Sequence, residues 1–109
     1  MYTVILTEPA DRDVDDILCW LKERSLRGAN SWLASYHRAI ASVQEHAGSF
    51  GLAPESPDHP EAIHEFTFST RHGNTYRLIF ILCDNMVHVL RVRGTGQSLL
   101  SRDELNLPE

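Results

Sequence analysis

Alternating side chains open the chain and point to a strand. The run Tyr2-Thr3-Val4-Ile5-Leu6-Thr7 combines a period of two with β-branched residues, a pattern typical of strands. Thr7 is a suitable helix N-cap, and Pro9 then falls in the first helical turn, where its missing N–H costs little. The sequence therefore predicts a short strand that leads directly into a helix.

Two stripes of helical spacing follow. The segment from Pro9 to about Arg24 has apolar residues at Ala10, Val14, Ile17, Leu18 and Leu21. After a break over residues 25–28, a second stripe runs up to Gly48 and consists of Ala29, Trp32, Leu33, Tyr36, Ile40, Val43 and Ala47. Spacings of three and four predict amphipathic helices, and the short link predicts an antiparallel helical hairpin. We expect Trp20, Trp32 and Tyr36 to pack in the hairpin rather than to stack on bases.

Strand patterns fill the second half of the chain. Residues 48–62 contain two Gly and three Pro, which is typical of an irregular loop. Strands are predicted over residues 64–70, 75–83 and 86–93, with the nearly continuous apolar middle strand in the centre of the sheet. Asp84-Asn85 forms a tight two-residue turn, and a short helical turn is expected around residues 102–105. This order predicts one α+β domain over residues 1–109, with an antiparallel four-stranded sheet and an N-terminal helical hairpin packed on one face.

Charge is distributed unevenly between the two halves of the chain. The formal net charge is −5; residues 1–65 carry five Lys/Arg and eleven Asp/Glu (5 − 11 = −6), and residues 66–109 carry five Arg and four Asp/Glu (5 − 4 = +1). An acidic protein does not bind nucleic acid through its overall field. The second half still leaves room for a focused arginine site.

The remaining composition argues against several classes of protein. No apolar run is long enough to span a bilayer, and the first residues lack the pattern of a signal peptide, so we expect a cytoplasmic protein without a membrane partner. Cys19 and Cys83 lie in apolar stretches and are expected to be reduced core thiols, although the sequence leaves a disulfide open. Glu61, His64 and Glu65 lack the spacing of a zinc motif. We expect no metal site and no cofactor.

Several landmarks resemble the RelE/ParE toxin superfamily over roughly residues 2–100. The most specific is a Tyr-Arg-aliphatic strand followed by a tight turn and a Val-rich strand. The matching segments, in order, are Val4-Ile5-Leu6-Thr7-Glu8-Pro9-Ala10, the helix from Trp32 to Ile40, Ala53-Pro54-Glu55, Gly73-Asn74-Thr75-Tyr76-Arg77-Leu78-Ile79-Phe80 and Val87-His88-Val89-Leu90-Arg91-Val92-Arg93. Their agreement in order carries the resemblance.

The resemblance implies the toxin of a type II toxin–antitoxin system, a growth inhibitor of the kind that serves plasmid stabilisation. Such a toxin is neutralised by a cognate antitoxin protein. RelE-like members cleave mRNA in the ribosomal A site, and ParE-like members inhibit DNA gyrase. Because the fold is shared while the targets differ, the fold alone does not choose between them.

The residues available for catalysis favour the ParE-like alternative. Arg77 matches the strand arginine that faces the substrate phosphate in RelE-like toxins. The lysines of that family would fall within residues 68–71, where only Arg71 is basic, and its later arginine and aromatic or histidine would fall within residues 95–101, where none occurs. His88 has a suitable pKa range for acid–base work, as has His72 in the turn. A ribosome-dependent mRNA interferase built on Arg77 and a non-toxic module that has lost activity remain the alternatives.

Strand register predicts where the arginines lie. A two-residue turn pairs Cys83 with Met86 and Arg77 with Val92, so that Arg77 shares a face with Ile79, Ile81, His88 and Leu90. Arg91 and Arg93 would then lie on the opposite face and form ion pairs with helix carboxylates. On the Arg77 face, Ile79, Ile81 and Leu90 would be partly bare, and such an apolar surface suggests that an antitoxin segment binds there. Arg77 on this face is a functional candidate, and a structural salt bridge is the open alternative. In the functional case, Arg77→Ala should reduce toxicity while leaving the fold nearly as stable.

Overall fold

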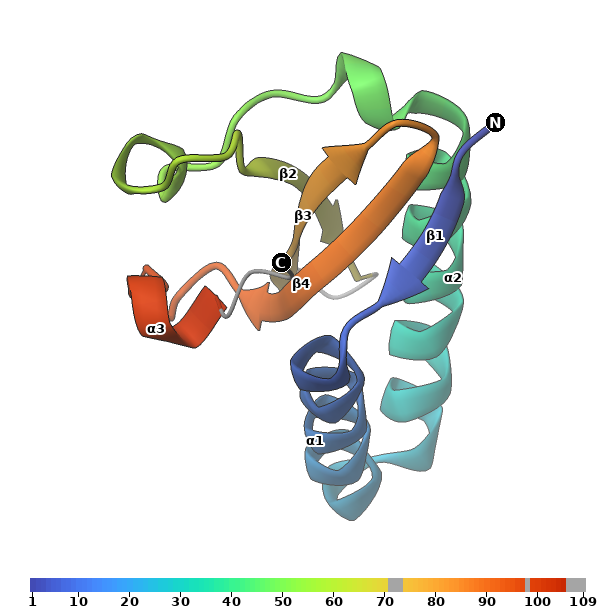
Figure 1. Ribbon diagram of the computed structural model, residues 1–109. Helices are drawn as coiled ribbons and strands as arrows, with labels where there is room; N and C mark the ends of the chain where they lie inside the picture. The colour runs from blue at the N-terminus through green and yellow to red at the C-terminus, as the bar shows by residue number, and fades with distance from the viewer. Residues whose placement is uncertain (71–73, 98, 106–109) are drawn as a thin grey trace.

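The computed structural model describes residues 1–70, 74–97 and 99–105, apart from the side chain of Arg102. The chain forms an α+β fold with a four-stranded sheet (Figure 1). Its elements are β1 (Thr3–Leu6), α1 (Glu8–Arg24), α2 (Leu26–His46), the 3₁₀ turns η1 (Ala47–Ser49) and η2 (Ser56–Asp58), β2 (His64–Ser69), β3 (Thr75–Cys83), β4 (Met86–Gly94) and α3 (Arg102–Leu105). The predicted order of strands and helices is confirmed, while the Arg71-His72-Gly73 part of the predicted turn lies outside the described residues.

Local capping fixes the helical hairpin. The Thr7 hydroxyl accepts a hydrogen bond from the N–H of Ala10 at 3.4 Å, as an N-cap does. Ser25 ends one helix and begins the next, because its N–H donates to the carbonyl of Leu21 at 2.7 Å and its hydroxyl accepts from the N–H of Gly28 at 3.0 Å. The predicted break is confirmed at Ser25 but is shorter than residues 25–28, because one extended serine is enough to reverse the chain.

The sheet is mixed, so the prediction of a purely antiparallel sheet is wrong. Its order is β1-β4-β3-β2, with β1 parallel to β4 and the other neighbours antiparallel. The helical hairpin explains this arrangement. α2 carries the chain back to where β1 starts, as the hydrogen bond from the Tyr2 N–H to the Gln44 carbonyl shows. β2 therefore enters the sheet in the direction of β1, and two hairpin turns later β4 runs that way as well.

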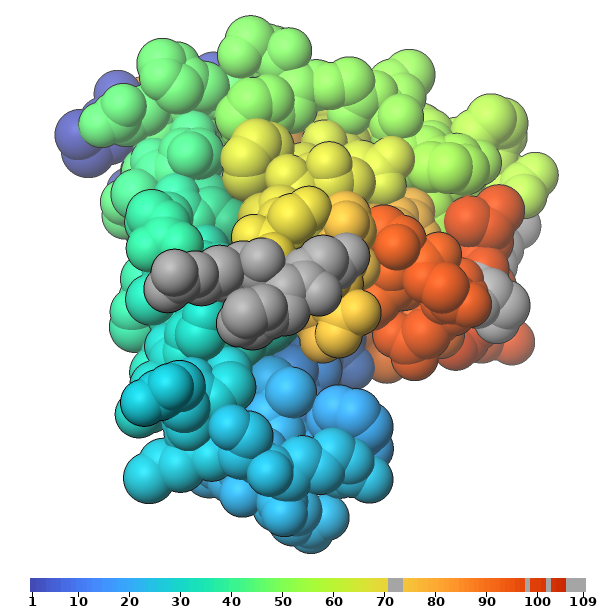
Figure 2. All heavy atoms as spheres, turned by 180° about the vertical axis from the view of Figure 1, so that it is seen from behind, coloured from blue at the N-terminus to red at the C-terminus, as the bar shows by residue number. Residues whose placement is uncertain are grey.

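One face of the sheet, called here the helix face, packs against α1 and α2. Figure 2 shows α2 and β2 side by side at the back of the molecule. Trp32 stacks on Tyr36 with ring centroids 5.2 Å apart and meets Tyr76 edge-on at 5.6 Å. The buried residues of this core are Ala10, Trp32, Tyr36, Ala39, Val43, Ala47, Phe68, Leu78, Phe80, Val87, Val89 and Val92. The apolar stripe of the second helix is thus confirmed as its buried side.

The opposite face, called here the loop face, carries a second core. Ile79, Ile81 and Leu90 are at most 2% exposed. They cluster with Ala53 and Ile63 from the loop before β2 and with Leu100 and Leu105 from the tail. In Figure 1 that loop and α3 lie on the side of β4 away from α2. The prediction that these three residues are partly bare is wrong, because distant segments of the same chain cover them.

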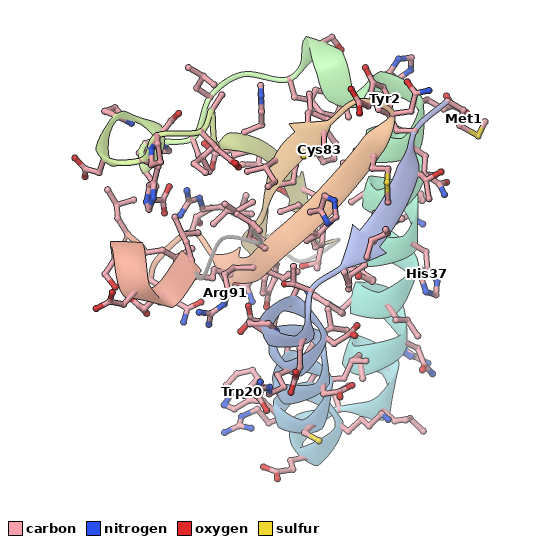
Figure 3. The ribbon with its side chains drawn as sticks, viewed as in Figure 1. Met1, Tyr2, Trp20, His37, Cys83 and Arg91 are labelled. Atoms are coloured by element: carbon pink, nitrogen blue, oxygen red, sulfur yellow. The ribbon has the colours of Figure 1, made fainter. Side chains whose placement is uncertain are left out.

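Three residues near the surface depart from the sequence prediction. Cys19 and Cys83 are free thiols but exposed, so the expectation that they lie in the core is wrong. Cys19 points away from the apolar stripe of α1, and Cys83 ends β3 at the turn. Trp20 is 54% exposed beneath the Arg24 guanidinium, whose central carbon lies 3.7 Å from the ring centroid (Figure 3). No helix among the described residues is long and apolar enough to cross a membrane.

Candidate functional site

A β-bulge in β4 decides which arginines share a face. From Cys83↔Met86 to Phe80↔Val89 the observed register follows the predicted one, and the turn places Asp84 at φ 55. The register then shifts by one residue, so that Arg77 pairs with Arg93 and Ile79 with Arg91. Leu90 is the extra residue, and because of it the side chains that follow in β4 point to the opposite face from the predicted one. Placing Arg91 and Arg93 on the helix face is therefore wrong, and all three arginines lie on the loop face.

Arg77 is the centre of a buried ion-pair network. Its Nε donates to Glu65 Oε1 at 2.7 Å, its Nη1 donates to Glu55 Oε2 at 3.0 Å, and its Nη2 donates to Glu55 Oε1. Glu55 Oε2 also accepts the N–H of Leu100 at 3.1 Å. Arg77 is 5% exposed and Glu55 is 2% exposed. As predicted, Arg77 lies with Ile79 and Ile81, but it is buried and fully paired rather than open to a substrate phosphate.

The network shifts the pKa values of its members in a consistent sense. Burial by itself raises the pKa of Glu55, but the hydrogen bonds from Arg77 and Leu100 outweigh it, and the pKa falls below 4.5. Burial by itself lowers the pKa of Arg77, whereas the bonds to Glu55 and Glu65 raise it above its ordinary value. Both partners are therefore held in their charged forms, as a structural ion pair requires.

Arg91 and Arg93 line a polar hollow of about 320 Å³ beside α1 and α3. Arg91 binds Asp13 with two bonds, from Nε to Oδ2 at 2.6 Å and from Nη2 to Oδ1 at 2.9 Å. Arg93 Nη1 donates to Glu104 Oε2 at 3.3 Å, while its buried Nε has no partner among the described residues. The predicted pairing of both arginines with helix carboxylates is confirmed. Figure 3 shows Arg91 where β4, α1 and α3 approach one another.

The environment of this hollow is strongly polar. The hydrogen bonds that Arg91 donates to Asp13 raise the pKa of Arg91. Hydrogen bonds from the N–H and hydroxyl of Ser101 lower the pKa of Glu104. Asp13 Oδ2 also accepts the N–H of Val92 at 3.0 Å, which anchors α1 to β4 at the bulge. The lining residues are Asp13, Asp16, Ile17, Arg91, Val92, Arg93, Gln97 and Glu104.

The proposed acid–base residues do not gather around Arg77. His88 is half-buried on the loop face and pairs in register with Ile5 on one side and Ile81 on the other. Arg77 lies four residues from Ile81 along β3, which corresponds to about 13 Å. Arg71 lies outside the described residues. The structure therefore does not bring His88 together with Arg77.

The sequence reasoning did not identify which carboxylates pair with the three arginines. These are Asp13, Glu55, Glu65 and Glu104. One available signal was the period in β4: strict alternation after Val89 would place Arg91 and Arg93 among the helices, which apolar helix faces do not accommodate. Glu55 lies in an irregular loop, and no local pattern reveals its partner.

Each arginine on the loop face has a carboxylate partner, and no histidine hydrogen-bonds to these pairs among the described residues. In the same part of the chain, no group of three or more His, Cys, Asp or Glu side chains could hold a metal ion. The accessible chemistry is a set of directional donors and acceptors around the hollow beside α1 and α3.

No protein-family model matches the chain, and a search of curated proteins finds no match.

Proposed function

We propose that this protein is the toxin of a type II toxin–antitoxin pair of the RelE/ParE kind, and that it acts by binding its target. The order of elements is consistent with the proposal: one strand, a helical hairpin and a three-stranded meander, with the Tyr-Arg-aliphatic segment forming β3. DNA gyrase is the proposed target. The proposal requires a cytoplasmic protein, because gyrase and the antitoxin are cytoplasmic.

The main support for binding rather than RNA cleavage is that the arginines are paired with carboxylates. Cleavage needs a free cation at the phosphate and an acid–base pair at the reacting oxygens. Arg77 is instead bound by Glu55 and Glu65 beneath the surface, and His88 lies apart from it along the sheet. Arg91 and Arg93, at the wall of an open hollow, are better placed to contact a protein surface.

The apolar residues of the loop face are already covered by the chain itself, so the cognate antitoxin has to bind at another surface. Ile79, Ile81 and Leu90 are covered by Leu100 and Leu105. An antitoxin that used them would first have to displace the tail, which is held by the Leu100–Glu55 and Arg93–Glu104 contacts. The hollow beside α1 and α3 offers charged groups without such displacement.

The proposal is tested by three measurements on one purified protein. Induced expression without antitoxin should arrest growth, and micromolar protein should inhibit gyrase supercoiling. Ribosome-dependent mRNA cleavage should be absent. Growth arrest with mRNA cleavage and normal supercoiling would support the interferase alternative, and unaffected growth would support the module that has lost activity.

Matched variants separate the function from the fold. Leu78→Asp places a charge in the helix-face core at a residue with 0% exposure, and this variant should neither fold nor arrest growth. Arg12→Ala removes an exposed ion pair with Glu8 and should leave both fold and toxicity unchanged. Arg91→Ala and Arg93→Ala should lower gyrase inhibition if the polar hollow forms the contact.

A further inference from the structure

β1 is an outer strand of the sheet, and no other strand among the described residues covers its free edge. The strand order places β4 on one side of β1 and nothing on the other. In Figure 1 no helix or strand crosses in front of β1. The other outer strand, β2, is different, because Leu52 pairs with His64 and the N–H of Glu65 donates to the carbonyl of Gly51. An open edge such as that of β1 can accept a strand from another chain.

The hydrogen bonds of β1 define which of its backbone groups are free. The N–H groups of Thr3 and Thr7 donate to carbonyl oxygens on the β4 side, at 2.9 Å and 3.0 Å. Successive residues of a strand direct their backbone groups to alternate sides. Ile5 therefore also faces β4, whereas Val4 and Leu6 direct their N–H and C=O groups to the free edge. Within the described residues these four groups have no hydrogen-bond partner.

The stretch of free groups is short and ends at the same two places in every copy of the chain. The N–H of Tyr2 also points away from β4, but it donates to the carbonyl of Gln44 in α2 at 2.7 Å. After Leu6 the chain passes through the N-cap Thr7 into α1. A long foreign strand therefore gains no further hydrogen bonds from β1 beyond Val4 and Leu6, whereas a second β1 has a free stretch of matching length.

The side chains along the free edge also suit a second copy. Val4 and Leu6 pack on the helix-face core, so Ile5 between them points to the loop face. Ile5 is 38% exposed there, and Met86 on the neighbouring strand is 37% exposed. Residues 2–7 carry no charged side chain, although the chain has a net charge of −5. Like charges directly opposite each other would destabilise a pair of strands, and an uncharged strand avoids them when it meets itself.

We infer that β1 pairs with β1 of a second copy of this chain, in an antiparallel arrangement about a two-fold axis at Ile5. Val4 of one copy then faces Leu6 of the other, and each such pair exchanges two hydrogen bonds, so all the free groups of both strands are used. Ile5 meets its own counterpart across the axis and becomes covered. Only two short strands meet, so the interface is small and the dimer is a transient one. This pairing does not depend on the proposed toxin function.

Sedimentation velocity of the full chain, from micromolar to submillimolar protein, tests the inference. The wild type should approach the mass of two chains as its concentration rises. Val4→Pro removes a free N–H without removing a bond to β4, so it should weaken the dimer at least about tenfold. Val4→Ala shortens the side chain but keeps the N–H, and it should associate nearly as the wild type does. A wild type that stays monomeric, or equal association of a folded Val4→Pro variant, would overturn the inference.

A charge exchange at Ile5 tests the two-fold axis. Ile5→Lys and Ile5→Glu each place like charges opposite each other, so each variant alone should be monomeric. In an equal mixture Lys faces Glu, and the dimer should return. Thr3→Lys is the control, because Thr3 is exposed and does not face its own counterpart, so this variant should associate as the wild type does. Circular dichroism checks that each variant is folded. A mixture of folded variants that remains monomeric would contradict the pairing.

Discussion

The two faces of the sheet each carry a buried core, but these cores are covered in different ways. The helix face is covered by two long amphipathic helices, which contribute Trp32, Tyr36 and Val43 to a continuous apolar core. The loop face is covered by an irregular loop and a short tail, which contribute Ala53, Ile63, Leu100 and Leu105. A buried ion-pair network fastens the loop-face cover. On the helix face, two regular helices bury the apolar residues of the sheet. On the loop face, an irregular loop and a tail bury them, and a few specific ion pairs hold these segments in place.

Disrupting the ion-pair network should have the largest effect on the cover of the loop face. Arg77→Ala would leave Glu55 and Glu65 facing each other without a cation, and loss of one partner of a buried pair destabilises by about 3–5 kcal/mol. Urea denaturation measures the loss. The exposed pair Arg12–Glu8 is the control, and Arg12→Ala should change stability by under about 0.5 kcal/mol. A wild-type midpoint for Arg77→Ala would show that the cover does not depend on the network.

This expectation replaces one drawn from the sequence. Placed on a partly bare face, Arg77 would be expected to be exchangeable for Ala without much loss of stability. The observed burial reverses that expectation. If Arg77→Ala abolishes toxicity, the melt of the same variant decides whether the loss concerns function or folding.

Truncating two adjacent core residues allows the rigidity of the two covers to be compared directly. Leu78 points to the helix face and Ile79 to the loop face, and both are 0% exposed. Each truncation to Ala should destabilise by about 2–5 kcal/mol, with Leu78→Ala at the upper end. The loop and tail can move to fill the cavity left by truncating Ile79, whereas the two packed helices cannot move to fill the cavity left by truncating Leu78. Equal losses in denaturant unfolding would mean that both covers are equally rigid.

Much of the fold could be predicted because it is encoded locally. The stripes of α1 and α2, the Thr7 cap and the Asp84-Asn85 turn depend on neighbours within a few residues. The bulge at Leu90 and the cover of the loop face depend on pairings across the chain: Asp13 with Arg91, and Glu55 with Arg77. No local period encodes which carboxylate meets which arginine. The candidate site was therefore predicted less well than the elements that carry it.

Truncating a residue of the tail should have a smaller effect on stability, confined to the loop face. Leu105 is 1% exposed at the end of α3 and belongs to the loop-face core. Leu105→Ala should loosen the tail at a loss of about 1–2 kcal/mol. Amide hydrogen exchange should rise first near Leu100 and around Ile79, while α2 keeps its protection. Equal loss of protection in α2 would contradict separate covers for the two faces.

Acid should weaken the loop face before the helix face. The pKa of Glu55 is lowered from 4.5 in the folded protein, so this carboxylate stabilises the fold above its unfolded pKa. The contribution is lost as the pH falls below about 4.5 through the folded value. Unfolding midpoints measured from about pH 6 to about pH 3 should fall less steeply for Glu55→Gln than for the wild type. Parallel slopes would show that other groups control acid unfolding.

The parallel pairing of β1 with β4 has a consequence for the order of events during synthesis. Thr3 pairs with Met86, so β1 has to wait for β4, which is made later. At about 5–20 residues per second, the 83 residues from Val4 to Met86 (86 − 3) take roughly 4–17 s to make. During that interval β1 has no strand to join, and the hairpin is the largest structure that nearby residues can form. A nascent chain of this protein therefore completes its sheet only after β4 has been made.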